Sequence, residues 1–305
     1  MVYSLWHESK SSTMLQHHLN RTGVDIKQIY EPISKELSDV EIELKKQINS
    51  MVIDDKDVNE IVSYFFSVSG KRLRPALVLL SAKSVNHKLS RPEQSSGTPN
   101  HKLISLATAV ELIHSASLIH DDIIDQASFR RNQPSMNKQF GDKLAVLLGD
   151  LLYTRAFLIL VNKFDNRILK ILSKCVENMC YGEISEQQIL QRKINKQRIT
   201  FEEYSKVLEA KTASFMSACC QCGAILAQAE EEIFRALKDY GFNVGMAYQI
   251  VDDCVDNDSV GISNINHAKE FAFKAKQSIE VLPNSIYKEK LFDLVDYILN
   301  QNDKL

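Results

Sequence analysis

Residues 109–125 read AVELIHSASLIHDDIID. An apolar helical run ends here in three carboxylates, Asp121, Asp122 and Asp125. Like charges one helical turn apart destabilise a helix, so the cluster needs a partner that neutralises it. The stretch therefore predicts a helix with an acidic cluster at its end and raises the question of what that cluster binds.

A second stretch repeats the pattern. VDDCVD at 251–256 gives Asp252, Asp253 and Asp256 the same D-D-x-x-D spacing, after the apolar run NVGMAYQIV. Positions i and i+4 of a helix share a face and i+1 lies close to i+4, so we expect each cluster to project its carboxylates in one direction. A solvated acidic helix end explains a single cluster. Two clusters of identical spacing favour a site in which Mg²⁺ bridges carboxylates to a substrate phosphate.

The segment after the second cluster resembles a calcium loop only at its start. DNDSVGISNINH (256–267) begins D-x-D and has Gly261 at its sixth position. An EF-hand needs an oxygen ligand at the fifth position and a bidentate glutamate at the twelfth. Val260 and His267 stand there instead, which argues against a calcium loop.

The rest of the chain reads as helical. No proline falls between Pro134 and Pro283, and a span of that length without proline suits long helices. Apolar residues recur at spacings of three and four in two further stretches: Ile33, Leu37, Val40 and Leu44, then Phe201, Tyr204, Val207 and Leu208. The sequence predicts an almost all-α protein, with surface loops at 86–101 and 257–267.

Composition excludes several classes. A net charge of −2 over 305 residues gives no reason to expect nucleic-acid binding. Six cysteines in so long a chain do not form a disulfide framework; we expect Cys219, Cys220 and Cys222 to be core residues and the compartment to be reducing and cytoplasmic. The apolar stretch 144–161 contains Asp150 and Arg155, which favours a buried core helix over a membrane span.

Cations accompany the acidic motifs. GKRLRP (70–75) offers Lys71, Arg72 and Arg74, of which Lys71 and Arg74 are three apart and can face together. Arg130 and Arg131 follow the first cluster. Arginine suits bidentate phosphate contact and lysine acts as a point charge. Either group alone could be a surface solubiliser, but basic residues close to an acidic metal motif indicate a polyanionic ligand.

These pieces resemble the trans-isoprenyl diphosphate synthases of the polyprenyl synthetase family. The matching stretches are GKRLRP, ELIHSASLIHDDIIDQASFRRNQPSMN, FGDKLAVLLGDLL, the Lys-Thr of EAKTASF, and GMAYQIVDDCVD. The resemblance implies the isoprenoid synthase fold, a bundle of long, mostly antiparallel helices around a deep central cavity, in a homodimer. It implies that residues 23–305 form a single catalytic domain, and we expect residues 1–22 to be a polar, weakly ordered leader.

The resemblance also implies roles for individual residues. The metal ligands would hold Mg²⁺, about three ions once substrate is bound, on the diphosphate of an allylic substrate: Asp121, Asp122, Asp125, Asp252, Asp253 and Asp256. Arg130 and Lys211 would bind the same diphosphate. Isopentenyl diphosphate would be bound by Lys71, Arg74, His114 and Arg131. Gln249 would line the reaction centre, and Thr212 would follow Lys211 at a kink beside the carbocation.

The implied reaction is chain elongation. Metals and cations stabilise the charge on the departing diphosphate, and the double bond of isopentenyl diphosphate attacks the allylic carbocation. Ala116 and Ser117 lie roughly 6–7.5 Å before Asp121 along the helix. Bulky residues there would stop growth, and small ones predict a linear product of about C30 or longer. We expect no transmembrane segment, but a peripheral membrane contact for product release.

One departure bears on activity. After about residue 260 the chain lacks a lysine-bearing segment that the family normally has. Two explanations are open: the printed sequence omits a loop that closes over the site only with ligand bound, or the deletion is real and the protein is a catalytically silent or regulatory subunit of a polyprenyl synthase. A terpene cyclase is a separate alternative, against which Lys71, Arg74 and Arg131 argue because a cyclase needs no isopentenyl diphosphate site.

Overall fold

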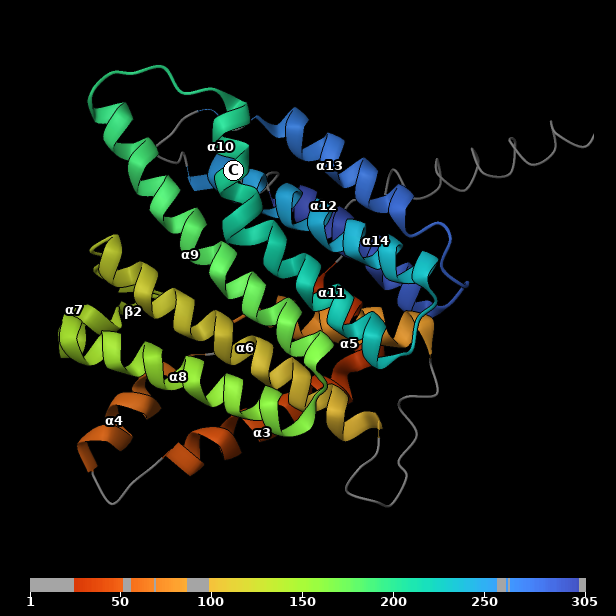
Figure 1. Ribbon diagram of the computed structural model, residues 1–305, viewed down its shortest axis with the longest axis horizontal. Helices are drawn as coiled ribbons and strands as arrows, with labels where there is room; N and C mark the ends of the chain where they lie inside the picture. Colours follow the sequence, from red (N-terminus) through yellow and green to blue (C-terminus); the bar gives the residue numbers. More distant parts are fainter. Residues whose placement is uncertain are drawn as a thin grey trace, which may run out of the picture. The chain divides into compact units, whose positions relative to one another are not determined.

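The computed structural model describes residues 25–51, 56–68, 70–86, 99–256, 262 and 264–301. Within these ranges the chain consists of helices, their connections and one two-stranded hairpin (Figure 1). The all-α class predicted from the sequence is confirmed. The predicted leader, residues 87–98 of the predicted loop, and residues 257–261 and 263 lie outside the described residues, whereas residues 99–101 already belong to a helix.

The chain divides into two compact units, each described by itself. The first unit comprises Ile33–Glu177 and Ala218–Phe234. The second comprises the described parts of Met1–Pro32, Asn178–Ser217 and Arg235–Leu305. Three long helices contribute residues to both units: α9 (Asn166–Ile194), α11 (Ser214–Leu226) and α12 (Glu231–Asp256).

Helix α6 is the centre of the first unit. The other helices of this unit are α3 (Ser34–Met51), α4 (Lys56–Phe65), α5 (Leu73–Val85), α7 (Met136–Phe140) and α8 (Asp142–Lys163). Helix α6 (Pro99–Ile124) packs against α3, α5 and α8, and lies along α8 in Figure 1. The two run antiparallel, because His120 contacts the Val146 carbonyl while Lys163 donates to Ser105 at 2.7 Å. The first acidic cluster thus stands at the end of a buried helix.

Helix α8 differs from the sequence prediction. Its inner face is buried through Ala145, Leu148 and Leu152, as expected of a core helix. Its outer face exposes four large apolar side chains: Leu144, Leu147, Leu158 and Val161. By length and composition alone, α6 and α8 could each cross a membrane. Asp150 and Arg155 are therefore not enough to exclude a membrane span for α8. Burial explains the apolar character of α6, 78% buried over its most apolar window, but not that of α8, at 39%.

A tight hairpin follows α6. Strand β1 (Phe129–Arg130) pairs antiparallel with β2 (Gln133–Pro134), which leaves Arg131 and Asn132 as the turn. Both turn residues have positive φ, 51° and 64°, as a type I′ turn requires. The hairpin reverses the chain and returns Arg130 to the end of α6.

The remaining elements belong to the second unit. These are α2 (Ile26–Tyr30), α10 (Phe201–Leu208), the π-helical turn η3 (Glu209–Ala213), α13 (Ile265–Ser278) and α14 (Ile286–Leu299), and the 3₁₀ turn η1 (Glu31–Ile33) follows α2. Helix α14 packs against α2 and α13. Buried Tyr240 of α12 donates its hydroxyl to the Leu291 carbonyl of α14 at 2.7 Å.

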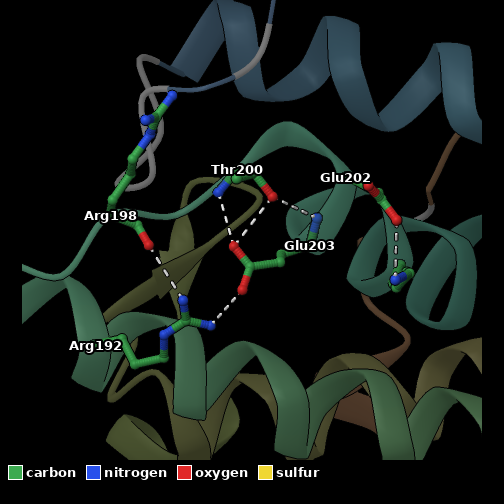
Figure 2. A network of polar contacts seen from close by, with 6 residues as sticks. Arg192, Arg198, Thr200, Glu202 and Glu203 are labelled. Atoms are coloured by element: carbon green, nitrogen blue, oxygen red, sulfur yellow. Dashed lines mark hydrogen bonds and ion pairs between the residues drawn. The ribbon is translucent and has the colours of Figure 1, made fainter.

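The start of α10 is fixed by a capping box (Figure 2). The Thr200 hydroxyl accepts from the Glu203 amide at 3.2 Å, and the Glu203 carboxylate accepts from the Thr200 amide at 2.9 Å. Arg192, in the last turn of α9, donates to Glu203 at 2.8 Å and to the Arg198 carbonyl at 3.2 Å. The Arg192 hydrogen bond and the Thr200 cap lower the pKa of Glu203 to about 2. These contacts hold the residue directly before Tyr204.

The cysteine prediction is confirmed. All six cysteines are free thiols. Cys219, Cys220 and Cys222 are fully buried on α11, where they act as small apolar residues.

Candidate active site

The first acidic cluster divides into two kinds of carboxylate. Asp122 is 1% exposed and accepts a charge-assisted fork from Arg130, with Nε at 2.7 and 2.8 Å and Nη2 at 2.6 Å. Asp121 is half-buried and Asp125 is exposed. The three carboxylates therefore differ in burial, and Arg130 of the hairpin contacts the most buried of them.

The second acidic cluster, at the end of α12, divides in the same way. Asp253 is 5% exposed. Its two oxygens accept from the Tyr204 hydroxyl at 2.8 Å and from the Gln249 amide nitrogen at 2.9 Å. Asp252 is exposed, and Asp256 is the last residue of α12, with a side chain outside the described part of the structure. In both motifs the second aspartate is buried and held by protein donors, and the first is less buried than the second.

The hydrogen bonds at Asp253 continue into the π-helical turn. Thr212 donates its hydroxyl to the Gln249 amide oxygen at 2.9 Å. The turn packs closely on α12, since a Cβ added at Gly245 would lie 2.5 Å from the Ala213 Cα. An irregular helical turn therefore stands where the resemblance implied a kink, and π-helical turns occur frequently at functional sites.

Lys211 of the same turn is held by carboxylates. Its Nζ lies 2.7 Å from Glu183 and is also ion-paired with Glu186, both on α9. Neither glutamate was predicted from the sequence to lie at the site. Their only distinguishing feature there is a spacing of three residues, which places both on one side of a helix. The structure therefore neutralises the lysine that was expected to contact the allylic diphosphate.

Two of the residues expected to bind isopentenyl diphosphate, Arg74 and His114, are in contact. Arg74 Nη1 lies 3.0 Å from His114 Nε2. Arg131 donates to the Val68 carbonyl at 3.1 Å, and a Cβ added at Gly70 would displace its guanidinium, 2.4 Å away. Burial and the field of Arg74 hold the pKa of His114 well below its ordinary value, so this imidazole is neutral.

Lys71 and Arg74 do not both lie on a helix. Helix α5 begins at Leu73, and Arg72 before it has the left-handed φ of 52°. Lys71 is exposed and precedes the helix. The two cations are therefore placed by a turn and a helix start, not by one helical face.

Arg72 is structural, which could not be predicted from the sequence, where it stands beside Lys71 and Arg74 in one basic segment. Its guanidinium donates to Glu111 of α6 at 2.6 Å and forms two hydrogen bonds with Glu41 of α3. Burial raises the pKa of Glu111, against the opposing effect of Arg72. Arg72 thus joins the GKRLRP segment to two core helices.

A small pocket that opens to solvent borders the first acidic cluster. Asp122, Arg130 and Arg131 line its polar side, and Tyr64, Val68 and Met136 belong to its apolar side. The predicted chain-length residues lie on α6 nearby in sequence: Ala116 is fully buried, and Ser117 is half-buried and donates to the His114 carbonyl at 2.9 Å.

Metal ligation must be judged from the donor types. Within the described ranges, no three His, Cys, Asp or Glu side chains are close enough together to form a metal site. Half-buried Asp121, in the last turn of α6, and exposed Asp125, directly after the helix, offer carboxylate oxygens. Oxygen donors that leave room for waters and phosphate are what Mg²⁺ accepts, so the residues present fit this ion.

Solved structures show the class of fold. Decaprenyl diphosphate synthase from Rhodobacter capsulatus has a TM-score of 0.77 at 23% identity, covering 91% of this chain and 99% of that one. A polyprenyl synthase from Caulobacter crescentus, solved with calcium and isoprenyl diphosphate, has a TM-score of 0.79 at 22% identity, covering 92% and 99%. The fold is the all-α isoprenoid synthase fold predicted from the sequence.

Sequence comparison then gives the family. The polyprenyl synthetase model matches residues 55–261. Octaprenyl diphosphate synthase of Escherichia coli is 31% identical over 238 residues, which cover 78% of this chain and 68% of that protein. The chain belongs to the polyprenyl synthetase family. The predicted enzyme class, a trans-prenyltransferase, is confirmed.

Proposed function

We propose that this protein condenses isopentenyl diphosphate with an allylic diphosphate, such as farnesyl diphosphate, to give a linear trans polyprenyl diphosphate, in a Mg²⁺-dependent reaction. The observation that carries the proposal is the repetition of the D-D-x-x-D motif at the ends of two helices, with the second aspartate of each motif buried and held by protein donors. Arg130 holds Asp122, and Tyr204 and Gln249 hold Asp253.

Mg²⁺ would be held by the less buried aspartates, Asp121 and Asp125 in the first motif and Asp252 in the second. Bound there, the ion would neutralise the charge that develops on the departing diphosphate. Asp122 and Asp253 remain predicted ligands, each with its rotamer already fixed by a neighbour. Arg130 and Lys211 supply positive charge for the same diphosphate, provided that it competes with Asp122 for Arg130 and with Glu183 and Glu186 for Lys211.

The second substrate is assigned to the basic group. Lys71, Arg74, His114 and Arg131 would bind the diphosphate of isopentenyl diphosphate. Neutral His114 takes its place beside Arg74 without adding a like charge, and its Nε2 accepts from the guanidinium. Arg72 holds the GKRLRP segment so that Arg74 faces α6. Thr212 and Gln249 supply fixed dipoles where charge develops.

We propose a product of about C30 or longer, because small residues before the first motif leave room for a growing chain. Relatives are named for octaprenyl and decaprenyl products, which supports the same range. Ser117 shares the side of α6 on which Asp121 lies, whereas buried Ala116 controls how closely that helix packs.

We also propose a homodimer. The outer face of α8 exposes four large apolar side chains: Leu144, Leu147, Leu158 and Val161. An exposed apolar surface of this kind marks an interaction site. A second copy of this chain is the proposed partner, and the cytoplasm the proposed compartment. A peripheral contact with a membrane for product release remains part of this proposal.

The test is incorporation of label. Purified protein is incubated with Mg²⁺, labelled isopentenyl diphosphate and farnesyl diphosphate, and the prenols released by phosphatase are sized. Long linear prenols support the proposal. A folded protein without incorporation would indicate a silent subunit, and a cyclised product from farnesyl diphosphate alone would indicate a cyclase; either result rejects it.

A further inference from the structure

Tyr204 is the one hydroxyl that reaches the second acidic motif from α10. Its ring is buried, at 1% exposure, and its hydroxyl donates to Asp253 Oδ2 at 2.8 Å. In the sequence this tyrosine is indistinguishable from a core residue, because it continues the apolar period of Phe201, Val207 and Leu208. A tyrosine needed only for packing would not require its hydroxyl at a carboxylate.

Asp253 accepts both of the hydrogen bonds that join it to Tyr204 and Gln249. An ionised carboxylate can only accept, so Gln249 must present its amide nitrogen to Asp253, at 2.9 Å. The Gln249 oxygen is then left to accept from Thr212 at 2.9 Å. Tyr204 and Gln249 each occupy one oxygen of Asp253, and so the rotamer of the carboxylate and the orientation of the amide are set together.

The chain of contacts links three elements of the second unit. Tyr204 is the fourth residue of α10, directly after the capped Glu203; Thr212 is in the π-helical turn; Gln249 and Asp253 are one turn apart on α12. The Asp253 carboxylate is therefore oriented by side chains from two helices, and its partner Gln249 is oriented in turn from the π-helical turn.

We propose that Tyr204 is a positioning residue for the second acidic motif: its hydroxyl holds Asp253, and through it Gln249 and Thr212, in the arrangement that takes a divalent cation together with a diphosphate. This inference rests on the proposed function for its ligand. It does not make Tyr204 a catalytic residue, since the hydroxyl acts through Asp253. Preorganised supporting groups of this kind strongly affect the affinity of metal sites.

The chain offers a matched control. Tyr240 is also fully buried in the second unit, and its hydroxyl donates to the Leu291 carbonyl at 2.7 Å. Tyr204→Phe and Tyr240→Phe each remove one buried hydroxyl and keep the ring. A purely structural role predicts the same consequences for both.

The experiment measures cation binding directly. Mn²⁺ is titrated by electron paramagnetic resonance into full-length protein in the presence of inorganic diphosphate, and thermal melting is recorded for each variant. We expect Tyr204→Phe to raise the half-saturating Mn²⁺ concentration about tenfold, because loss of a supporting partner typically costs about 10–100-fold in metal affinity. Tyr240→Phe should leave it unchanged at a similar loss of melting temperature.

Equal Mn²⁺ midpoints for Tyr204→Phe and wild type, or equal shifts for the two variants, would overturn the inference. In the incorporation assay Tyr204→Phe should lower kcat at saturating Mg²⁺ while the KM for isopentenyl diphosphate stays within about twofold, as expected for loss of an interaction outside that binding group. If the wild type makes no prenyl product, the proposed function fails, but the Mn²⁺ titration still decides the role of Tyr204.

Discussion

Replacing Arg72 by methionine should destabilise the protein strongly. The substitution keeps a long side chain and the same left-handed backbone, but removes every contact of the guanidinium with Glu111 and Glu41. Glu111 is 3% exposed and would be left as a buried carboxylate without this partner. Glu41 is 38% exposed, so water replaces most of what it loses.

The magnitude follows from Glu111. Removing one partner of a buried ion pair costs about 3–5 kcal/mol. In a large domain about 1 kcal/mol shifts the melting temperature by about 2 °C, so the midpoint should fall by about 6–10 °C. The pH dependence has a definite sign. Burial already raises the pKa of Glu111 and loss of Arg72 raises it further. A carboxyl whose pKa is higher in the folded state favours folding at low pH, so the loss should be larger at pH 8 than at pH 5.

Thermal melts followed by circular dichroism check this expectation at both pH values. Arg192→Met is the matched control, because its ion pair with Glu203 is exposed and should shift the midpoint much less. In the double variant Arg72→Met/Glu111→Gln the buried charge is gone, and at least half of the loss should return. A midpoint no lower than that of the control, or a double variant with the summed loss of both single changes, would refute the reasoning.

Three further predictions concern single positions. Ser117→Phe should shorten the prenyl product, because an aromatic ring on the side of α6 that carries Asp121 fills space before the first motif; an unchanged length distribution by thin-layer chromatography removes the chain-length argument. Below about pH 6.5 the wild type should lose stability to urea relative to His114→Gln, by at most about 1.4 kcal/mol per pH unit. The cause is that the unfolded chain binds a proton that the neutral folded imidazole does not. Plots of unfolding free energy against pH that run parallel for the two proteins would contradict this. Glu203, with a pKa of about 2, should stabilise the fold above about pH 4.5 and lose that contribution as the pH falls toward 2; Glu203→Gln should abolish this part of the acid transition, and an identical transition in the variant argues against it.

Much of the fold follows from local patterns. Helical period, absence of proline and small-residue runs predicted the helices that carry both acidic motifs, and Ile33, Val40 and Leu44 are buried as their spacing predicted. These signals are read from residues close together in the chain. The two faces of α8 could not be separated in this way, because an apolar face looks the same whether it meets the core or solvent.

The site was predictable as a set of residues but not as a set of contacts. Repeated spacing identified the aspartates, yet nothing local indicated that Asp122 and Asp253 would be turned inward by Arg130 and Tyr204. These partners come from a hairpin turn and from another helix. Arg72 shows the same limit, because its left-handed backbone and its contact with Glu111 depend on tertiary packing.

The central proposal is that both acidic motifs are required for one Mg²⁺-dependent transfer reaction. The most direct measurement compares Mg²⁺-dependent incorporation of labelled isopentenyl diphosphate by wild type, Asp121→Asn, Asp252→Asn and the double variant, with exposed Asp239→Asn as control. Groups that act as one unit are strongly non-additive. We predict that each single change lowers kcat by about 100-fold or more, that the double variant is little worse, and that the control matches wild type. Near-normal incorporation by either single variant, or losses that multiply in the double variant, would contradict the account.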